Sequence, residues 1–450
     1  MTSSLGDLLR PRRAVLLTFG FLTAFVVINR FVHLICNYCT TYWPISVFAF
    51  RAPPTFYYPN LSHILVASLT TVIFILSLIA LAKTRYKLLY VITFGIVLIL
   101  GSNLTQGFQH GLLTPIEGYG GFRNEYFNDA VEIENPLHFL SSYIDIQPNL
   151  LPHSRTHPPG AILLFYYLSK LLTKPAMISI IITVISVVAH AYYLWKLFCN
   201  ELKNESIAGY STFLFLLLPA IQIYFSASID ALIGACLLGV LYHFFHSQSN
   251  FGLLAAILLL MLASFMSFGS LFIVPVIFAY EFLEKRSIRR SFYLAAATGL
   301  LYLLLFSTTG FNYAQSFIIA AKLENPYGPW LLARPLVYTA TRFEGLFELV
   351  LFYGPFLGLI TIRGLKENMA SSKLKKITLV GVACLALMLL LGVYREGETA
   401  RAAIFIYPYL IFPVGIYLKD HPISLGERNI LAATIFLQTI LMQMVGNYFW

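Results

Sequence analysis

Residues 101–160 read GSNLTQGFQHGLLTPIEGYGGFRNEYFNDAVEIENPLHFLSSYIDIQPNLLPHSRTHPPG. This is the longest polar interval of a chain in which 58% of the 450 residues are hydrophobic and only 11% are charged. Acidic side chains crowd its middle, and two histidines flank an arginine near its end. We therefore expect this stretch to form the floor of an active site at a membrane surface.

The rest of the chain is dominated by apolar runs. Runs of about 17–25 residues recur along nearly its whole length, and each is long enough to cross the hydrocarbon core of a bilayer as a helix. A helix satisfies its own backbone polar groups inside lipid, so repeated runs of this length indicate a helical bundle. The 38 Phe and 28 Tyr suit lipid-facing and interfacial positions. These features exclude a soluble globular protein.

These patterns predict an all-α polytopic membrane protein with one transmembrane domain over residues 1–450 and about 13 spans. An outer loop with interfacial helices is expected at 104–174, and a second outer loop at 309–345. Residues 158–174 are too short to span and fit a half-helix that opens on Pro158 and Pro159. The expected spans are 14–36, 62–82, 88–103, 175–197, 207–228, 231–247, 250–266, 268–284, 291–308, 346–363, 376–393, 402–418 and 428–446.

The net charge of +10 comes from basic residues in short loops, which is a topology signal rather than a nucleic-acid-binding patch. No nucleic-acid partner is expected. With a cytoplasmic N-terminus, one register leaves these basic loops inside and puts 104–174, 309–345 and 394–401 on the same outer face. Seven ionisable side chains could then share one cavity: Glu117, Asp129, Asp230, Glu344, Arg395, Glu398 and Arg401.

The cysteines carry little functional signal. Three of the five fit small core residues in or beside apolar runs: Cys199, Cys236 and Cys384. Cys36 and Cys39 form a lone C-x-x-C, a weak pattern for a metal or disulfide pair. The first apolar run, 14–36, follows three arginines and is long enough to span, so no cleavable signal peptide is needed.

Glu125 and Asp129 are the leading catalytic candidates. They are four residues apart, so on a helical turn both carboxylates face the same side. Neighbouring carboxylates raise one pKa and suit general-base catalysis or a divalent cation. The alternative is an ordinary solvated acidic face, although such a helix seldom lies between a Gly-Tyr-Gly-Gly turn and a Pro-Pro half-helix.

His153, Arg155 and His157 are candidates for substrate binding. The guanidinium offers a two-pronged donor for phosphate, and the imidazoles offer donors that switch with pH. Simple anchoring at the membrane interface is the alternative. A zinc site is disfavoured because two histidines at this spacing have no obvious third ligand nearby, and no metal ligand is assigned.

Two further segments on the expected outer face contribute substrate-binding candidates. Asp230 closes the sequence Ser-Ala-Ser-Ile-Asp, where it could cap the next helix or reach a substrate hydroxyl. Residues 394–401 read YREGETAR and supply Arg395, Glu398 and Arg401. An arginine entering a bilayer is costly unless it is paired, so Arg401 either pairs with Glu398 or binds a lipid phosphate.

An acidic outer-loop segment from Asn124-Glu125 to Asp129, followed by Thr156-His157-Pro158-Pro159-Gly160 before a half-helix, resembles the GT-C superfamily of integral-membrane glycosyltransferases. The pattern is similar to protein O-mannosyltransferases and to the lipid A aminoarabinose transferase, and it covers roughly residues 100–310. Two departures stand out. The usual Asp-Glu pair reads Asn124-Glu125 here, which leaves Asp129 as the candidate base, and extra spans precede the loop.

The resemblance implies a GT-C-like bundle that transfers a hexosyl or pentosyl group from a polyprenyl-phosphate-linked donor to a glycan, lipid or protein acceptor. Asp129, supported by Glu125, would deprotonate the acceptor hydroxyl. Arginines would hold the departing lipid phosphate: Arg155, Arg395 and Arg401. Some relatives use a divalent cation. The expected setting is a bacterial plasma membrane, an endomembrane being the alternative, with membrane lipids as partners and the active site facing outward.

Three other classes of protein remain open. A transporter or flippase places binding groups near the bilayer midplane, often on broken helices in repeated halves, and no such repeat is evident. An O-antigen-ligase-like transferase would handle a different lipid-linked donor. A non-catalytic scaffold would leave the acidic and basic clusters without a role.

Overall fold

The computed structural model describes residues 60–118, 125–246, 249–326, 328, 330–333, 335–366, 372–394 and 399–446, with isolated positions between 13 and 27. Every regular element in these ranges is helical, which confirms the expected all-α class for the described part of the chain. Most of the expected span 14–36 lies outside the described residues. So do Cys36 and Cys39, and also Arg395 and Glu398.

Four described helices are long and apolar enough to cross a membrane: α4 (Leu61–Lys83), α11 (Pro175–Leu202), α14 (Ile229–His246) and α17 (Arg289–Thr309). A bent pair built from α20 (Pro335–Tyr353) and α21 (Pro355–Lys366) makes a fifth if it counts as one span. Three other apolar helices are shorter: α5 (Leu88–Leu104), α10 (Gly160–Leu171) and α15 (Asn250–Met266). The larger number of spans expected from the sequence stays a prediction.

The remaining elements of the described residues are mostly short, and the longer ones among them, α22, α24 and α25, lie toward the C-terminus. They are η1 (Gln109–Leu113), α6 (Thr114–Glu117), α7 (Tyr126–Ala130), α8 (Pro136–Ile146), η2 (Gln147–Asn149), α9 (Pro152–Arg155), α12 (Glu205–Leu216), α13 (Pro219–Tyr224), η3 (Phe268–Phe272), α16 (Ile273–Lys285), α18 (Tyr313–Glu324), α19 (Trp330–Ala333), α22 (Lys373–Leu390), α23 (Thr399–Ala402), η4 (Ile404–Ile406), α24 (Tyr407–Asp420) and α25 (Leu425–Val445).

The centre of the bundle is formed by α11, α12, α14 and α24, and it is mostly apolar, with a few buried polar side chains such as His190 and Thr212. The run from Ile207 to Leu216 in α12 is buried throughout. By contrast, α4 and α17 turn long apolar faces outward, with Leu69 61% exposed and Leu303 64% exposed. Helices that are apolar yet exposed require an apolar surrounding, which agrees with the membrane setting expected from the sequence.

The connections between the described helices gather at two ends of the bundle. The end that carries the short connections 84–87, 203–204, 286–288 and 421–424 is named the turn end. The end that carries 105–117, 125–159, 225–228, 310–312 and 391–394 is named the loop end. At the loop end the Ser226 hydroxyl donates to the Gly111 carbonyl at 2.7 Å, and at the turn end the Tyr210 hydroxyl donates to the Arg428 carbonyl at 2.8 Å.

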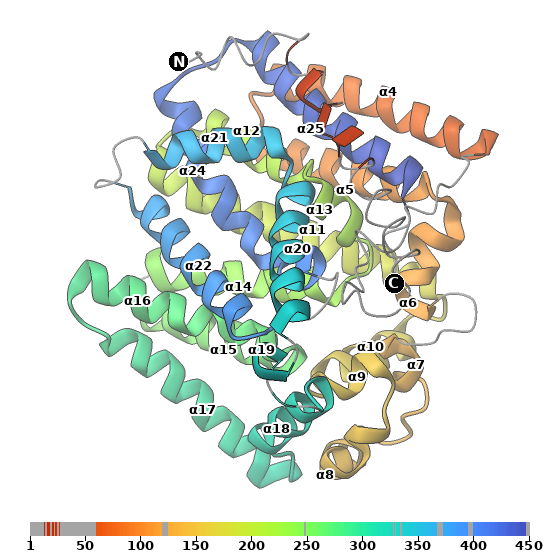
Figure 1. Cartoon of the computed structure of the whole chain (residues 1–450), viewed down its shortest axis with the longest axis vertical. Helices are drawn as coiled ribbons and strands as arrows, with labels where there is room; N and C mark the ends of the chain where they lie inside the picture. The colour runs from red at the N-terminus through yellow and green to blue at the C-terminus, as the bar shows by residue number, and fades with distance from the viewer. Residues whose placement is uncertain are drawn as a thin grey trace.

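The three regions that the sequence assigns to one face do meet at the loop end. Gln147 donates a hydrogen bond to the Ser316 carbonyl at 3.1 Å, and the Tyr143 ring meets Phe311 edge to face at 5.6 Å. Arg342 donates to the carbonyl of Tyr394. Figure 1 shows α7, α8, α9, α10 and α18 grouped together at the lower right. That this face is the outer one stays a prediction.

Acidic residues at the turn end support helix starts. Glu281 accepts hydrogen bonds from the Ser291 amide at 2.8 Å and the Ser291 hydroxyl at 2.6 Å, in the first turn of α17. Glu201 accepts from Ser372 and the Lys373 amide, where α22 begins. A carboxylate at a helix start satisfies amides that have no partner within the helix. These carboxylates are therefore structural.

Two of the expected spans are interrupted near their middle in the described structure. The run 207–228 breaks at Pro219 into α12 and α13, because proline removes a backbone donor and clashes with the preceding turn. The run 346–363 bends by 95° where α20 meets α21, at Gly354, whose φ is +91°. Glycine tolerates this left-handed conformation, and so permits the sharp bend.

Buried amide side chains satisfy the backbone groups freed by these breaks. Gln222 donates to the Leu216 carbonyl at 2.6 Å, and Asn103 donates to the Gln222 carbonyl at 2.6 Å. Near the second break, Gln438 donates to the Leu351 carbonyl at 2.7 Å. Broken helices at membrane depth persist only when such groups are paired within the protein.

The start of α10 depends on a close approach that only glycine allows. A Cβ at Gly160 would lie 2.2 Å from the backbone oxygen of Phe265, at the end of α15. We expect Gly160→Ala to destabilise the protein by about 1–3 kcal/mol, because the two backbones must separate. Gly299→Ala is the control, since a Cβ there meets nothing within 4 Å. Equal melting temperatures of the two variants would contradict this packing.

Candidate active site

The two catalytic candidates both point toward the segment that contains α9, but not as the sequence predicted. Glu125 is the N-cap of α7, with an extended φ and ψ of −82° and 149°, so it does not share a helical face with Asp129. Its Oε2 lies 3.4 Å from Nδ1 of His153. Asp129, within α7, accepts a hydrogen bond from the Leu151 amide at 3.2 Å. The acidic and basic halves of the loop are thus in contact.

The segment 151–157 is held by side chains from α8 and η2. Tyr143 is buried, and its hydroxyl donates to the His157 carbonyl at 2.6 Å. Gln147 is also buried and donates to the Arg155 carbonyl at 3.0 Å. Neither residue could be identified as a support from the sequence, because a Tyr and a Gln four residues apart form no recognisable motif. Only the fold brings them under α9.

The three residues of the His-x-Arg-x-His run have different surroundings. His153 faces Glu125, and Nδ1 of His157 donates to the His153 carbonyl at 2.8 Å. The Tyr126 ring meets His157 edge to face at 5.4 Å. Nε of Arg155 is buried and makes no hydrogen bond to a described residue. A buried guanidinium donor without a partner favours an anion as its ligand.

The pKa of Asp129 is raised above its ordinary value, mainly because burial penalises the ionised carboxylate. Hydrogen bonds from Ser154 and the Leu151 amide oppose the shift, and the nearby Glu132 adds to it. The Leu151 amide donates a hydrogen bond to Asp129, whereas the Ser154 hydroxyl lies near the carboxylate but makes no hydrogen bond to a described residue. A carboxyl group whose pKa is raised binds a proton more readily than a solvated one, which suits a general base.

This shift predicts the pH dependence of any reaction that uses Asp129 as a base. The base must be ionised, so activity falls as pH drops through the raised pKa, at a higher pH than an ordinary aspartate would give. A pH–rate profile of kcat/KM measures this limb. The same shift makes the contribution of Asp129 to stability largest at low pH, and that contribution is lost as pH rises through the folded-state pKa. A limb at the ordinary aspartate pKa would contradict the assignment.

A second cluster lies where α14 begins. Nε of Arg401 is 3.7 Å from the Asp230 carboxylate, and both side chains are about one fifth exposed, at 19% and 21%. Asp230 is not the helix cap that the sequence allowed, because the Ser228 hydroxyl accepts the Asp230 amide at 3.1 Å. Glu398, one of the two partners that the sequence allowed for Arg401, lies outside the described residues.

The structure adds residues around this second cluster that the sequence did not single out. Arg342 donates to the carbonyls of Leu389 at 2.7 Å and Val393 at 2.8 Å, which fixes the end of α22. Glu348 is 1% exposed and accepts the Ala400 amide at 3.3 Å. Glu344, expected in the cavity, is 4% exposed on the same helix. The sequence offered two signals for these residues: Arg342 lies in a polar loop, and Glu348 lies inside an apolar run.

The two clusters are joined through neighbouring elements. Asn128, beside Asp129, donates to the Glu117 carbonyl at 3.2 Å and so ties α7 to α6. The element η1 directly precedes α6 in the chain. Its Gly111 carbonyl accepts a hydrogen bond from the hydroxyl of Ser226, which lies just before α14. Both clusters therefore border the loop end. The single cavity expected to hold them stays a prediction.

The described residues of the site form no donor set for a metal ion. Among the described residues, no three His, Cys, Asp or Glu side chains are arranged to hold one. Glu125 is paired with His153, and Asp129 accepts a backbone amide. The divalent cation that the resemblance allows stays a prediction, and the mechanism below uses none.

Comparisons with known proteins give little beyond a partial likeness of fold. Neither a protein-family model nor a curated protein sequence matches the chain. The crystal structure of the Archaeoglobus fulgidus oligosaccharyltransferase, in complex with zinc and sulfate, is similar at 13% identity and a TM-score of 0.46. The match covers 78% of this chain and 53% of that one, so the chain spans about half the length of that enzyme. A likeness of this size assigns no activity.

Proposed function

We propose that this protein is a membrane glycosyltransferase that takes a sugar from a polyprenyl-phosphate donor. The observation that carries the proposal is the contact between the acidic helix α7 and the basic segment 151–157. It brings a half-buried carboxylate with a raised pKa next to a segment whose arginine has a buried, unused donor. A base beside a phosphate-binding cation is what displacement of a sugar from a lipid phosphate requires.

In the proposed reaction, Asp129 removes the proton of the acceptor hydroxyl as its oxygen attacks the anomeric carbon of the sugar. The new bond is the glycosidic C–O bond, and the bond that breaks joins the anomeric carbon to the phosphate oxygen. The phosphate, still attached to the polyprenyl chain, leaves with the electron pair, so negative charge develops on its oxygen. Arg155 stabilises that charge, with Arg401 and Arg395 as further candidates.

The other residues of the site have supporting roles in this proposal. Glu125 holds His153, which fixes the start of α9. Asp230 fixes Arg401 through their ion pair and could accept a hydrogen bond from a sugar hydroxyl. The acceptor is a glycan, lipid or protein. We propose a bacterial plasma membrane, with the loop end facing outward.

The proposal is tested with the purified full chain and a polyprenyl-phosphate-linked sugar. Mass spectrometry should detect polyprenyl phosphate that copurifies, and a defined acceptor should release more of it from the donor. Comparison of glycans from a deletion strain and its parent identifies the sugar and the acceptor. If the donor stays intact with every acceptor class, and the glycans of the two strains are identical, then the proposal fails.

A lipid-linked-substrate transporter is a second candidate, and one observation favours it. The two broken segments lie against each other, with the Tyr224 ring stacked on Phe352 at 5.2 Å. Transporters often bind substrates at broken helices. The amides near these breaks, however, already pair with backbone carbonyls. Movement of a fluorescent lipid across proteoliposomes without release of polyprenyl phosphate would support the transporter.

A further inference from the structure

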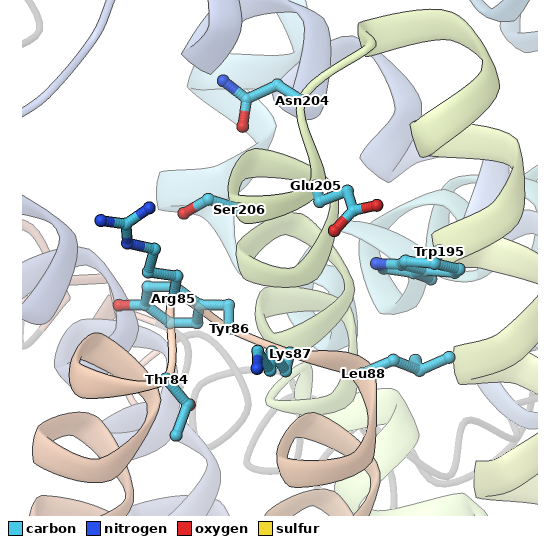
Figure 2. A pocket seen from close by; sticks show the side chains of 9 residues that line it. All are labelled: Thr84, Arg85, Tyr86, Lys87, Leu88, Trp195, Asn204, Glu205 and Ser206. Carbon is cyan, nitrogen blue, oxygen red and sulfur yellow. The ribbon is translucent and has the colours of Figure 1, made fainter.

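A cavity of about 510 Å³ lies at the turn end, on the opposite side of the bundle from the candidate active site. It is formed by the connection between α4 and α5 and by the junction of α11 and α12. Figure 2 shows the Arg85 side chain reaching toward Ser206, with the Tyr86 hydroxyl on the same side. Glu205 points the other way, toward Trp195. The cavity therefore has one wall rich in hydrogen-bond donors.

Tyr86 provides an observation that itself points to a ligand. The residue is 2% exposed, and its hydroxyl is buried without a hydrogen bond to any described residue. Burial raises the pKa of Tyr86, with Arg428 opposing the shift, so the hydroxyl keeps its proton and can donate it. A buried hydroxyl with no partner costs free energy. A ligand in the cavity would remove that cost.

The start of α12 adds further donors to the same wall. Asn204 is its N-cap and accepts the Ile207 amide at 3.1 Å, but the N–H groups of the first helical residues have no partner within the helix. Their partial positive charge favours an anion. The turn is pressed onto this helix, because a Cβ at Gly209 would lie 2.0 Å from the Tyr86 backbone oxygen. Arg85 and Tyr86 are thus held in place beside these amides.

We propose that this cavity binds the phosphate group of a membrane lipid headgroup. The guanidinium of Arg85 and the hydroxyls of Tyr86 and Ser206 would donate to the phosphate oxygens, together with the first amides of α12. The cavity lies where the apolar helices α4 and α11 end, which is the depth of headgroups in a bilayer. Half-buried Trp195 is typical of this interface. The proposal does not rest on the glycosyltransferase assignment.

The test uses native mass spectrometry of the delipidated full chain in detergent. The probes are phosphatidylglycerol, a diacylglycerol with the same acyl chains but no phosphate, and inorganic phosphate. We expect phosphatidylglycerol to bind, the diacylglycerol not to bind, and inorganic phosphate to compete only weakly. Full competition by inorganic phosphate at equal concentration would overturn the lipid assignment in favour of free phosphate.

Matched variants separate the site from general charge effects. Arg85→Asn should weaken phosphatidylglycerol binding by about tenfold, the loss expected for hydrogen bonds to a charged group. Arg286→Asn is the control, because Arg286 also lies at the turn end with a left-handed φ of 51°, close to the 52° of Arg85. Asparagine tolerates this conformation in both. Equal losses in the two variants would overturn the site.

A second pair of variants tests the hydroxyl of Tyr86. Tyr86→Phe should weaken binding by about tenfold and leave the melting temperature of the delipidated protein the same or higher, because the hydroxyl is buried and makes no bond within the described protein. Tyr210→Phe should lower the melting temperature and leave lipid binding unchanged, because the Tyr210 hydroxyl donates to the Arg428 carbonyl. If Tyr86→Phe melts as low as Tyr210→Phe and binds lipid normally, then the hydroxyl is structural and the proposal is overturned.

Discussion

Replacement of Asp129 by asparagine is expected to abolish sugar transfer while the protein stays folded. A general base contributes about 10²–10⁴-fold to a rate, and an amide cannot take the acceptor proton. The asparagine side-chain oxygen can still accept the Leu151 amide, so α7 should keep its contact with the segment 151–157. The measurement is the rate of polyprenyl phosphate release at saturating donor and acceptor.

Stability and a matched control make this result decisive. Burial disfavours the ionised form of Asp129, so a neutral asparagine should melt at the same temperature or slightly higher at neutral pH. Glu134→Gln serves as the control, since it removes an exposed carboxylate from the same loop. Normal turnover by the Asp129 variant, or an equal loss in the Glu134 variant, would rule Asp129 out as the base.

Replacement of Arg155 by methionine is expected to lower the rate of transfer by about 10²–10³-fold, which is the usual cost of removing one donor that stabilises a developing charge. Methionine keeps most of the apolar stem but cannot bind phosphate. Arg155→Lys should recover part of the loss, because it keeps the charge but not the two-pronged geometry. Single-turnover rates with a polyprenyl-phosphate donor measure the effect on the chemical step.

The fold should tolerate Arg155→Met, because other residues hold the backbone of α9. Gln147 contacts the carbonyl of Arg155 rather than its side chain. Arg289→Met is the control, since it removes an exposed arginine at the turn end. If the Arg155 variant lost activity only in parallel with its melting temperature, then the role of Arg155 would be structural.

Several elements of the fold could be predicted from hydropathy alone. The expected span 62–82 became α4, 250–266 became α15, and the half-helix expected at 158–174 became α10. Each has a run of apolar residues bounded by polar, proline or glycine residues, which is a local signal. The breaks at Pro219 and Gly354 were not predicted, because the sequence does not show whether a neighbouring amide will satisfy the freed backbone.

The pairings within the candidate site could not be predicted from the sequence. The i, i+4 spacing of Glu125 and Asp129 suggested one shared helical face, yet Glu125 precedes the helix and turns to His153. Similarly, the sequence left Arg401 with two alternatives, Glu398 or a lipid phosphate, and did not indicate its contact with Asp230 on α14. Local spacing favours local partners, whereas packing brings distant segments together.

The sequence by itself determined the helical class and the separation of short basic connections from the long polar loop where we propose the chemistry. These features follow from hydropathy and charge, which each residue carries regardless of its neighbours. Only the tertiary structure decided which carboxylate contacts which histidine or arginine, and how Tyr143 and Gln147 support the site. It also decided that the Tyr86 hydroxyl is buried without a partner among the described residues. Those features depend on contacts between residues far apart in the chain, and the sequence pattern does not encode such contacts locally.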